Sequence, residues 1–401
     1  MTSTVSRQPH LITLAICVGL SALTLNSIVP SLPTIADEFD VSYAVANLAV
    51  AGYLGVTAIM QLIMGPLSDR YGRRPVLLIA IVVYLLGSLL SLVSGDIVVF
   101  LAGRVLQAAS ITGYALSMAI IRDTNEPQDA ASRIGYVAAG MALGPMLGPV
   151  LGGVLEESFG WRAIFIVYSV LGVALIALIW VDVNETNRTR SSTLGEQIRA
   201  YPELFGSRRF WGYALCAAFS IATFFCFTSG APLVGRELFD LTPSAIGIAM
   251  GSITFGFLIG NLITGRIAKR TRLSTMMITG RIAALLGMFV SLGILAAGMT
   301  HPISFFAPLI LMGFGNGLTL PNTNTGVVSV RPKLAGSAAG LAGALVVGTG
   351  ALMTSVTGIV VKGPNAALIL LGILILCGAF ALASALYVRH VDQTEEEHSR
   401  S

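Results

Sequence analysis

Long apolar runs separated by short polar turns occupy most of the 401-residue chain. Each run is long enough for a helix, which rises 1.5 Å per residue, to cross the roughly 30 Å hydrocarbon core of a bilayer. The runs are continuous rather than alternating, so they indicate spanning helices and not the strands of a barrel. The pattern predicts twelve spans, at 10–30, 43–64, 75–94, 97–121, 133–155, 162–181, 210–232, 243–265, 274–298, 303–328, 336–361 and 365–388.

The composition indicates an integral membrane protein. Hydrophobic residues make up 55% of the chain and charged residues only 11%, whereas soluble globular domains carry about 25% charged residues. The net charge of +4 is spread over short loops, which argues against nucleic-acid binding. The first apolar run is too long for a cleavable signal peptide, and the other spans follow it.

Positive charge predicts the orientation of the spans. Of the 24 Lys and Arg residues, only Arg162, Arg236 and Lys362 would lie on the outer face, while Arg104 and Arg281 lie within spans. The others collect on the opposite face, and basic loops stay in the cytoplasm. We therefore expect both termini to be cytoplasmic.

One long polar segment divides the spans into two sets of six. The predicted parts are an N-terminal six-helix bundle at 1–181, a cytoplasmic linker at 182–209, a C-terminal six-helix bundle at 210–389 and a cytoplasmic tail at 390–401. A basic turn at Gly265–Arg270 echoes the position of one at Gly65–Pro75, although it lacks the acidic residue. Paired repeats of this kind are typical of transporters whose halves rock around a midplane cavity.

The turn between the second and third spans reads Gly65-Pro-Leu-Ser-Asp-Arg-Tyr-Gly-Arg-Arg-Pro75. Gly65 and Gly72 permit the reversal, and Asp69 can hold the arginines by charge-assisted hydrogen bonds. The turn resembles the loop between helices 2 and 3 of the major facilitator superfamily, and it departs from that pattern only at Ser68. The resemblance implies an all-α membrane protein with twelve transmembrane helices in two six-helix pseudo-repeats. It also implies that the first, fourth, seventh and tenth spans line the cavity and that the third, sixth, ninth and twelfth are peripheral.

Arg122 and Asp123 end the fourth span on the cytoplasmic face. The resemblance implies that Asp123 pairs with Arg73, and that Asp69 caps the start of the eleventh span near 334–337, when this face is closed. Ordinary interfacial ion pairs, worth about 0–1 kcal/mol each, are the alternative. The predicted cytoplasmic latch comprises Gly65, Asp69, Arg70, Gly72, Arg73, Arg122 and Asp123.

Two arginines lie within spans, where each costs about 2.5–3.5 kcal/mol and should find acceptors inside the protein. Arg104, with Gln107 one turn on, resembles the superfamily's helix-4 pattern Arg-x-x-Gln-Gly, with Ala108 in place of the glycine. We expect Arg104 to act in the cavity or in coupling; hydrogen bonds to carbonyl oxygens of the first span are the structural alternative. Arg281 lies near the cytoplasmic end of the ninth span, and we expect it to snorkel to the surface.

The fifth span carries a glycine stripe at four-residue spacing. It consists of Gly140, Gly144, Gly148 and Gly152, with Pro145 and Pro149 between them. Such a stripe permits close helix approach, which by itself predicts only a packing helix. The run resembles the helix-5 motif of the antiporter branch of the superfamily, especially its drug exporters, and this resemblance favours efflux over uptake.

The end of the first span, Leu25–Pro33, resembles that of the Bcr/CflA drug-resistance branch, which has a carboxylate where this chain has Asn26. An amide binds ligands by hydrogen bonds but carries no proton. No Asp or Glu occupies a mid-membrane position in the predicted spans. Three alternatives therefore stay open: a proton uses Asp123, it uses a carboxylate at a cavity mouth, or transport is not coupled to protons.

The expected cavity is apolar with scattered amides, which favours neutral or weakly anionic amphiphiles over multiply charged cations. The candidate cavity residues are Asn26, Arg104, Gln107, Met141, Phe224, Phe227, Asn316 and Asn322. Helix packing is the commoner role for such aromatic side chains. The cysteines lie inside apolar runs and the histidines at or beyond helix ends, so neither a disulfide nor a metal site is predicted.

The sequence contains no nucleophile–base pair, metal-ligand cluster or nucleotide-binding loop, so we expect neither an enzyme nor a cofactor. The resemblance predicts a monomeric secondary exporter of drug-like or amphipathic small molecules in the lipid bilayer of the bacterial inner membrane. Protons are the expected coupling ion. A dedicated exporter or facilitator of one endogenous solute, such as an amino acid or siderophore, and a non-transporting membrane sensor are the alternatives.

Overall fold

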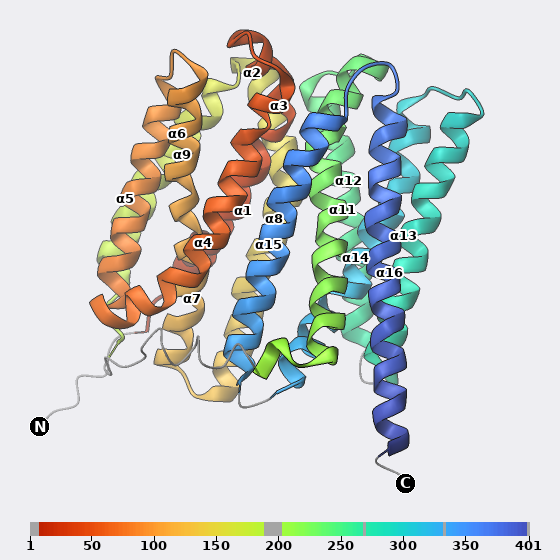
Figure 1. The fold of residues 1–401 in the computed structure, drawn as a ribbon. Coiled ribbons are helices and arrows are strands. Elements are labelled where there is room, and N and C mark those ends of the chain that lie inside the picture. The colour runs from red at the N-terminus through yellow and green to blue at the C-terminus, as the bar shows by residue number, and fades with distance from the viewer. Residues whose placement is uncertain (1–7, 188–202, 268–269, 332–333, 399–401) are drawn as a thin grey trace, which may run out of the picture. The chain divides into compact units, whose positions relative to one another are not determined.

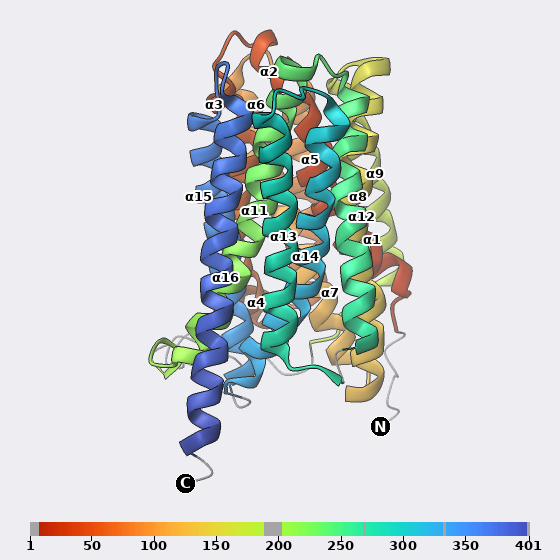
Figure 2. The ribbon, with the colours of Figure 1, turned by 90° about the vertical axis from the view of Figure 1, so that its right-hand side faces the viewer.

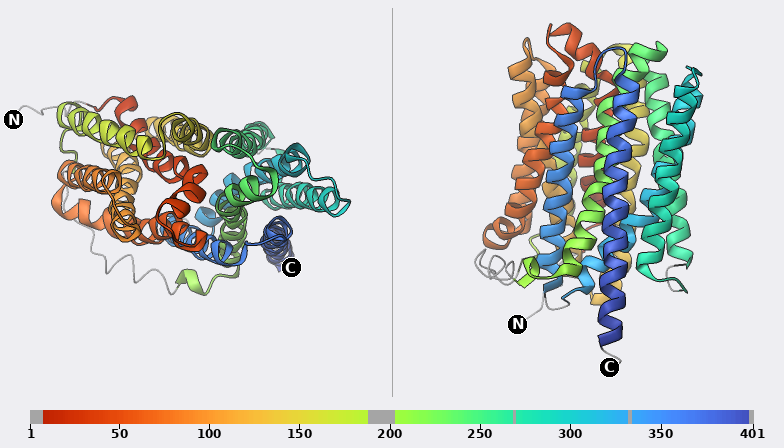
Figure 3. Two further views of the ribbon diagram at one scale, coloured as in Figure 1. Left: turned by 90° about the horizontal axis from the view of Figure 1, so that it is seen from above. Right: turned by 45° about the vertical axis from the view of Figure 1, so that its right-hand side comes forward.

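The computed structural model describes residues 8–187, 203–267, 270–331 and 334–398, and the regular structure in these ranges is helical. The chain separates into two compact units, Met1–Leu194 (unit 1) and Gly195–Ser401 (unit 2) (Figure 1). Within each unit, the long helices run close to a common direction, as the end-on view in Figure 3 shows.

Unit 1 contains α1 (Leu11–Ser27), η1 (Val29–Ser31), α2 (Leu32–Glu38), α3 (Tyr43–Ala46), α4 (Leu48–Tyr71), α5 (Arg73–Leu92), α6 (Ile97–Gln107), η2 (Ala108–Ser110), α7 (Ile111–Thr124), α8 (Pro127–Phe159) and α9 (Arg162–Asp182). Unit 2 contains α11 (Arg208–Phe239), α12 (Pro243–Ile267), α13 (Leu273–Ala296), α14 (Pro302–Ser329), α15 (Ala335–Val360) and α16 (Ala366–His398). Several predicted spans are built from two or three consecutive elements; the fourth, for example, is α6, η2 and α7.

Eleven helical stretches of the described residues are long and apolar enough to cross a membrane. They correspond to every predicted span except the fifth, which forms α8. That helix has 33 residues, exceeds the predicted 133–155 at both ends and includes the buried Glu156. The last helix, α16, runs on through most of the segment predicted as a tail, so it extends beyond the neighbouring α13 (Figure 2).

Polar side chains cap helices where the chain leaves an apolar run. At the start of α6, the carboxylate of Asp96 accepts hydrogen bonds from the backbone N–H groups of Val98 and Val99. At the start of α11, the hydroxyl of Ser207 accepts one from Phe210. These caps satisfy first-turn amides that have no partner inside their own helix.

The glycine stripe of α8 packs directly on α1. A Cβ placed on Gly148 would lie 2.9 Å from the Cβ of Asn26. One placed on Gly152 would fall against the carbonyl oxygen of Ser27, and one on Gly144 against Ala22. Only hydrogen fits at these positions, so the stripe sets the distance between the two helices.

A second close contact joins α13 and α14 in unit 2. A Cβ on Gly280 would lie 2.6 Å from the carbonyl oxygen of Gly315, and a Cβ on Gly315 would meet the carbonyl oxygen of Gly280. One on Gly287 would meet the carbonyl oxygen of Pro308. The two backbones are therefore close enough for a long side chain of α13 to bond to polar side chains of α14.

We expect Gly152→Ala to lower the free energy of unfolding by about 1–3 kcal/mol, because the added methyl group must displace the α1 backbone. Thermal unfolding of the purified protein in detergent measures the effect. Gly55→Ala in α4 is the matched control, since a Cβ there meets nothing within 4 Å. Equal melting temperatures for the two variants would show that α1 and α8 are not tightly packed at this position.

Candidate functional site

The break between α4 and α5 depends on one glycine. Gly72 has φ +100°, a conformation that side chains other than glycine rarely adopt. A Cβ there would also fall against the carboxylate of Glu185. Gly72 therefore permits both the sharp turn and the close approach of the segment that follows α9.

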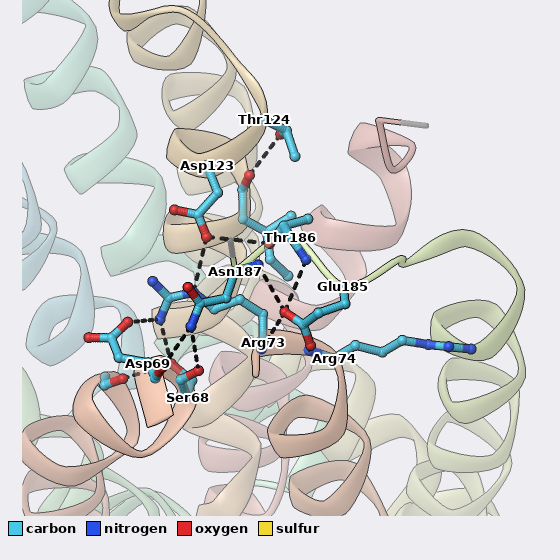
Figure 4. Close-up of polar contacts among 11 residues, drawn as sticks. Ser68, Asp69, Arg73, Arg74, Asp123, Thr124, Glu185, Thr186 and Asn187 are labelled. Atoms are coloured by element: carbon cyan, nitrogen blue, oxygen red, sulfur yellow. Dashed lines mark hydrogen bonds and ion pairs between the residues drawn. The ribbon is translucent and has the colours of Figure 1, made fainter. Parts of the chain in front are cut away.

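Arg73, the first residue of α5, binds two acidic side chains. Its Nη1 lies 2.6 Å from Oδ1 of Asp69, and its Nε donates to Oδ2 of Asp123 over 3.1 Å. Nη1 also donates to the hydroxyl of Ser68 over 2.5 Å. The structure thus brings together Arg73 and Asp123 at the ends of two predicted spans (Figure 4). The contact expected between Asp69 and the eleventh span joins residues of different units and stays a prediction.

The segment after α9 adds contacts that sequence reasoning missed. Glu185 accepts hydrogen bonds from the backbone N–H groups of Arg73 (2.9 Å) and Arg74 (3.3 Å), so it caps the start of α5. Asn187 donates to the carbonyl oxygen of Asp69 over 2.7 Å, and the hydroxyl of Thr186 lies 3.3 Å from Oδ2 of Asp123 (Figure 4). Residues 185–187 therefore bind the beginning of the predicted linker to the turn between α4 and α5.

We call Ser68, Asp69, Arg73, Asp123, Glu185, Thr186 and Asn187 the loop cluster. Two arginines of the predicted latch lie outside it. Arg70 is exposed and stacks on Tyr71, with its guanidinium carbon 5.3 Å from the ring centroid. Arg122 is also exposed, and the described residues offer it no ion-pair partner. Both residues lie near the turn in the sequence, yet neither side chain belongs to the loop cluster.

Arg104 is buried in unit 1 and hydrogen-bonded on every side. Its Nε donates to the carbonyl oxygen of Ala49 over 3.1 Å, and Nη1 and Nη2 both donate to that of Thr24 over 3.3 Å. Nη1 also donates to Oε1 of Gln107 over 2.6 Å, and the Tyr53 ring lies below the guanidinium. The alternative to a cavity role was that Arg104 donates to carbonyl oxygens of the first span. This geometry matches that alternative, because Thr24 belongs to the first span. The cavity role of Arg104 stays a prediction.

Two of the amides predicted to line the cavity, Asn26 and Asn322, bond within their own helices. Asn26 donates to the carbonyl oxygen of Ala22, and Asn322 to that of Leu318, each over 2.7 Å. Both side chains are buried. An amide nitrogen carries two N–H groups, so an amide bonded four residues back still has its carbonyl oxygen and a second N–H to offer a ligand.

The remaining cavity candidates differ in exposure. Phe227 is buried and packs edge-on against Phe306, with centroids 6.1 Å apart, whereas Phe224 is partly exposed beside Phe225. The side chain of Met141 and the surroundings of Gly140 lie outside the described part of the chain. The Nε2 of Gln107 donates to the hydroxyl of Ser88, so this side chain extends the Arg104 network to α5.

The expected snorkelling of Arg281 is wrong. Its side chain is fully buried in unit 2, where Nε donates to Oγ1 of Thr319 over 2.9 Å and Nη2 donates to Oδ1 of Asn316 over 2.7 Å. The close approach of α13 and α14 at Gly280 and Gly315 lets the side chain turn inward. The glycine directly before Arg281 was the signal in the sequence that could have indicated this.

The family model described as Major Facilitator Superfamily matches residues 14–355. The chain belongs to the major facilitator superfamily. It is therefore an all-helical, multi-pass membrane transporter of that fold and not an enzyme, as the turn at 65–75 predicted.

Bacterial transporters are among its relatives. The MFS-type transporter YdgK of Bacillus subtilis is 32% identical over 85% of this chain and 86% of its own length. Multidrug resistance protein D of Escherichia coli is 26% identical over the same shares, and a chloramphenicol resistance protein of Pseudomonas aeruginosa is 27% identical over 74% of this chain and 71% of its own. The predicted resemblance to drug-resistance members is thus confirmed at moderate identity.

Solved structures share the fold. A D-xylose–proton symporter superposes with a TM-score of 0.74 over 94% of this chain and 96% of its own, at 14% identity. A bacterial homologue of the human lysosomal transporter Spinster, in an inward-facing and occupied conformation, gives 0.73 over 96% of both chains, at 16% identity. At these identities the likeness shows the fold alone.

We expect Arg73 and Asp123 to be energetically coupled. A double-mutant cycle with Arg73→Gln and Asp123→Asn should give a coupling free energy of about 1 kcal/mol in thermal or denaturant unfolding, because the pair is only partly exposed. The same cycle between Asp123 and its chain neighbour Arg122 should give a value near zero. Equal coupling in both cycles would mean that the contact contributes only general charge attraction.

Proposed function

We propose that this transporter exports drug-like or amphipathic small molecules across the bacterial inner membrane by alternating access, in exchange for protons. The observation that carries the proposal is the packing of the α8 glycine stripe on α1 at Asn26 and Ser27. That stripe resembles the helix-5 motif of antiporters that export drugs, and at Gly144, Gly148 and Gly152 it packs tightly against α1. Relatives named for multidrug and chloramphenicol resistance support the same direction of transport.

The loop cluster suits a lock that opens and closes during transport. Its ion pairs join partly exposed charged groups and are worth about 0–1 kcal/mol each. Together they can hold one state, yet each can break without a large cost. The positive-inside pattern would place the cluster, and both termini, on the cytoplasmic face.

Proton coupling would have to use a carboxylate other than one at position 26. Asp123 lies in the loop cluster, where its protonation would weaken the bond to Arg73. Glu156, buried near the end of α8, is a second candidate at the other end of unit 1. Each of these carboxylates lies near the end of a helix, as expected if the proton-binding group lies at one end of the transport path.

Flux in vesicles that contain the purified protein tests the proposal. A pH gradient should drive a neutral drug such as chloramphenicol, and a monovalent cation such as ethidium, against the direction of proton flow, whereas a sodium gradient should have no effect. Movement that only equilibrates each drug would indicate a facilitator. Movement of neither compound would favour a transporter for one endogenous solute, and absence of flux for any solute would favour a sensor.

Asn26→Asp should make transport more steeply dependent on pH and shift selectivity toward cations. The new carboxylate would titrate and would attract positive charge at a buried position beside Gly148. Ethidium and chloramphenicol flux measured at several pH values gives both effects. Asn26→Ser, which keeps a hydrogen-bonding group but cannot titrate, should keep the pH profile of the unmodified protein. An unchanged pH profile and selectivity in Asn26→Asp would remove this position from the mechanism.

A further inference from the structure

The two buried arginines differ in how completely their guanidinium groups are satisfied. All three nitrogens of Arg104 donate hydrogen bonds, and an aromatic ring covers one face. In Arg281, Nε and Nη2 donate, but Nη1 is buried and has no hydrogen-bond partner among the described residues. One N–H edge of the Arg281 guanidinium is therefore without an acceptor among the described residues.

No described Asp or Glu forms an ion pair with Arg281. Arginine stays protonated in proteins, so its charge lies in the interior of unit 2 without an acidic partner. A buried charge is costly unless it is paired and hydrogen-bonded. A ligand with an anionic oxygen would supply both the missing charge and the missing acceptor.

The partners of Arg281 place its guanidinium where three helices meet. Asn316 and Thr319, which accept from it, belong to α14, and the Nδ2 of Asn316 lies 3.5 Å from Oγ1 of Thr223 on α11. These two helices are the seventh and tenth spans, which are expected to line the cavity. Arg281 itself comes from α13, the ninth span, which is expected to be peripheral. The side chain thus brings a charge from a peripheral helix to the two cavity helices.

We propose that Arg281 binds the acidic group of the transported molecule through Nη1, so that weakly acidic amphiphiles are substrates. Asn316 holds the guanidinium plane by accepting from Nη2, which leaves the Nη1 edge free for a carboxylate or phenolate oxygen. In Arg104, by contrast, Nε, Nη1 and Nη2 each already donate to groups of unit 1. This inference rests on the proposed export of amphipathic molecules and names one chemical class of them.

Binding of an acid and of its uncharged analogue to the full-length protein tests the inference. Radiolabelled naphthalene-1-acetate and naphthalene-1-acetamide differ only in the acidic group. In detergent, the unmodified protein should bind the acid at least about tenfold more tightly than the amide. Arg281→Gln should weaken acid binding at least about tenfold and change amide binding less than about twofold. Arg281→Lys keeps the charge without the planar fork, and its acid affinity should fall between the two.

A purely structural role for Arg281 would give a different result. Equal loss of both ligands in Arg281→Gln, or no preference for the acid in the unmodified protein, would overturn the inference. Arg266→Gln, which removes an exposed positive charge at the end of α12, should leave the acid-to-amide ratio unchanged and so controls for net charge. Melting temperatures identify a variant that has failed to fold. If Arg281→Gln fails to fold, the acid-to-amide affinity ratio of Arg281→Lys decides. A ratio in Arg281→Lys equal to that of the unmodified protein would refute the proposal. Export of neutral drugs without any preference for the acid would refute this inference and leave the proposed function standing.

Discussion

Polar atoms inside a bilayer have no water to bond to, so each must find a partner within the protein. This constraint explains much of the polar structure in both units. Asn26 and Asn322 donate to carbonyl oxygens of their own helices, and Arg104 uses backbone oxygens of two other helices together with a neighbouring amide. A donor that departs from this rule, such as Nη1 of Arg281, therefore points to a ligand more strongly than it would in a soluble protein.

Close packing replaces the hydrophobic effect as the force that holds spanning helices together, because lipid tails are as apolar as the side chains. Glycine makes close packing possible at two of the helix contacts. Gly148 and Gly152 seat α8 on α1, and Gly280 and Gly315 bring α13 against α14. The second contact also has a chemical consequence, since it turns Arg281 from the membrane surface into the interior of unit 2.

The loop cluster lies in a different environment, because the charged side chains of its ion pairs are partly exposed to water. Its ion pairs are individually weak, and Arg73 gains its importance by joining α4, α5 and α7 at one point. Glu185 and Asn187 add the segment after α9 to the same point. A set of weak contacts that share one residue can be held or released together, as a lock in a transport cycle requires.

The sequence by itself determined the helical membrane fold and the superfamily, because hydrophobic run length and the turn at 65–75 are local signals. It also indicated the contact between Arg73 and Asp123, through a resemblance tied to particular residues. Only the tertiary structure decided which way Arg281 points, since that depends on how α13 is rotated against α14. It alone revealed Glu185 as the cap of α5, because 112 residues separate Glu185 from Arg73 and no local pattern records which distant segments meet.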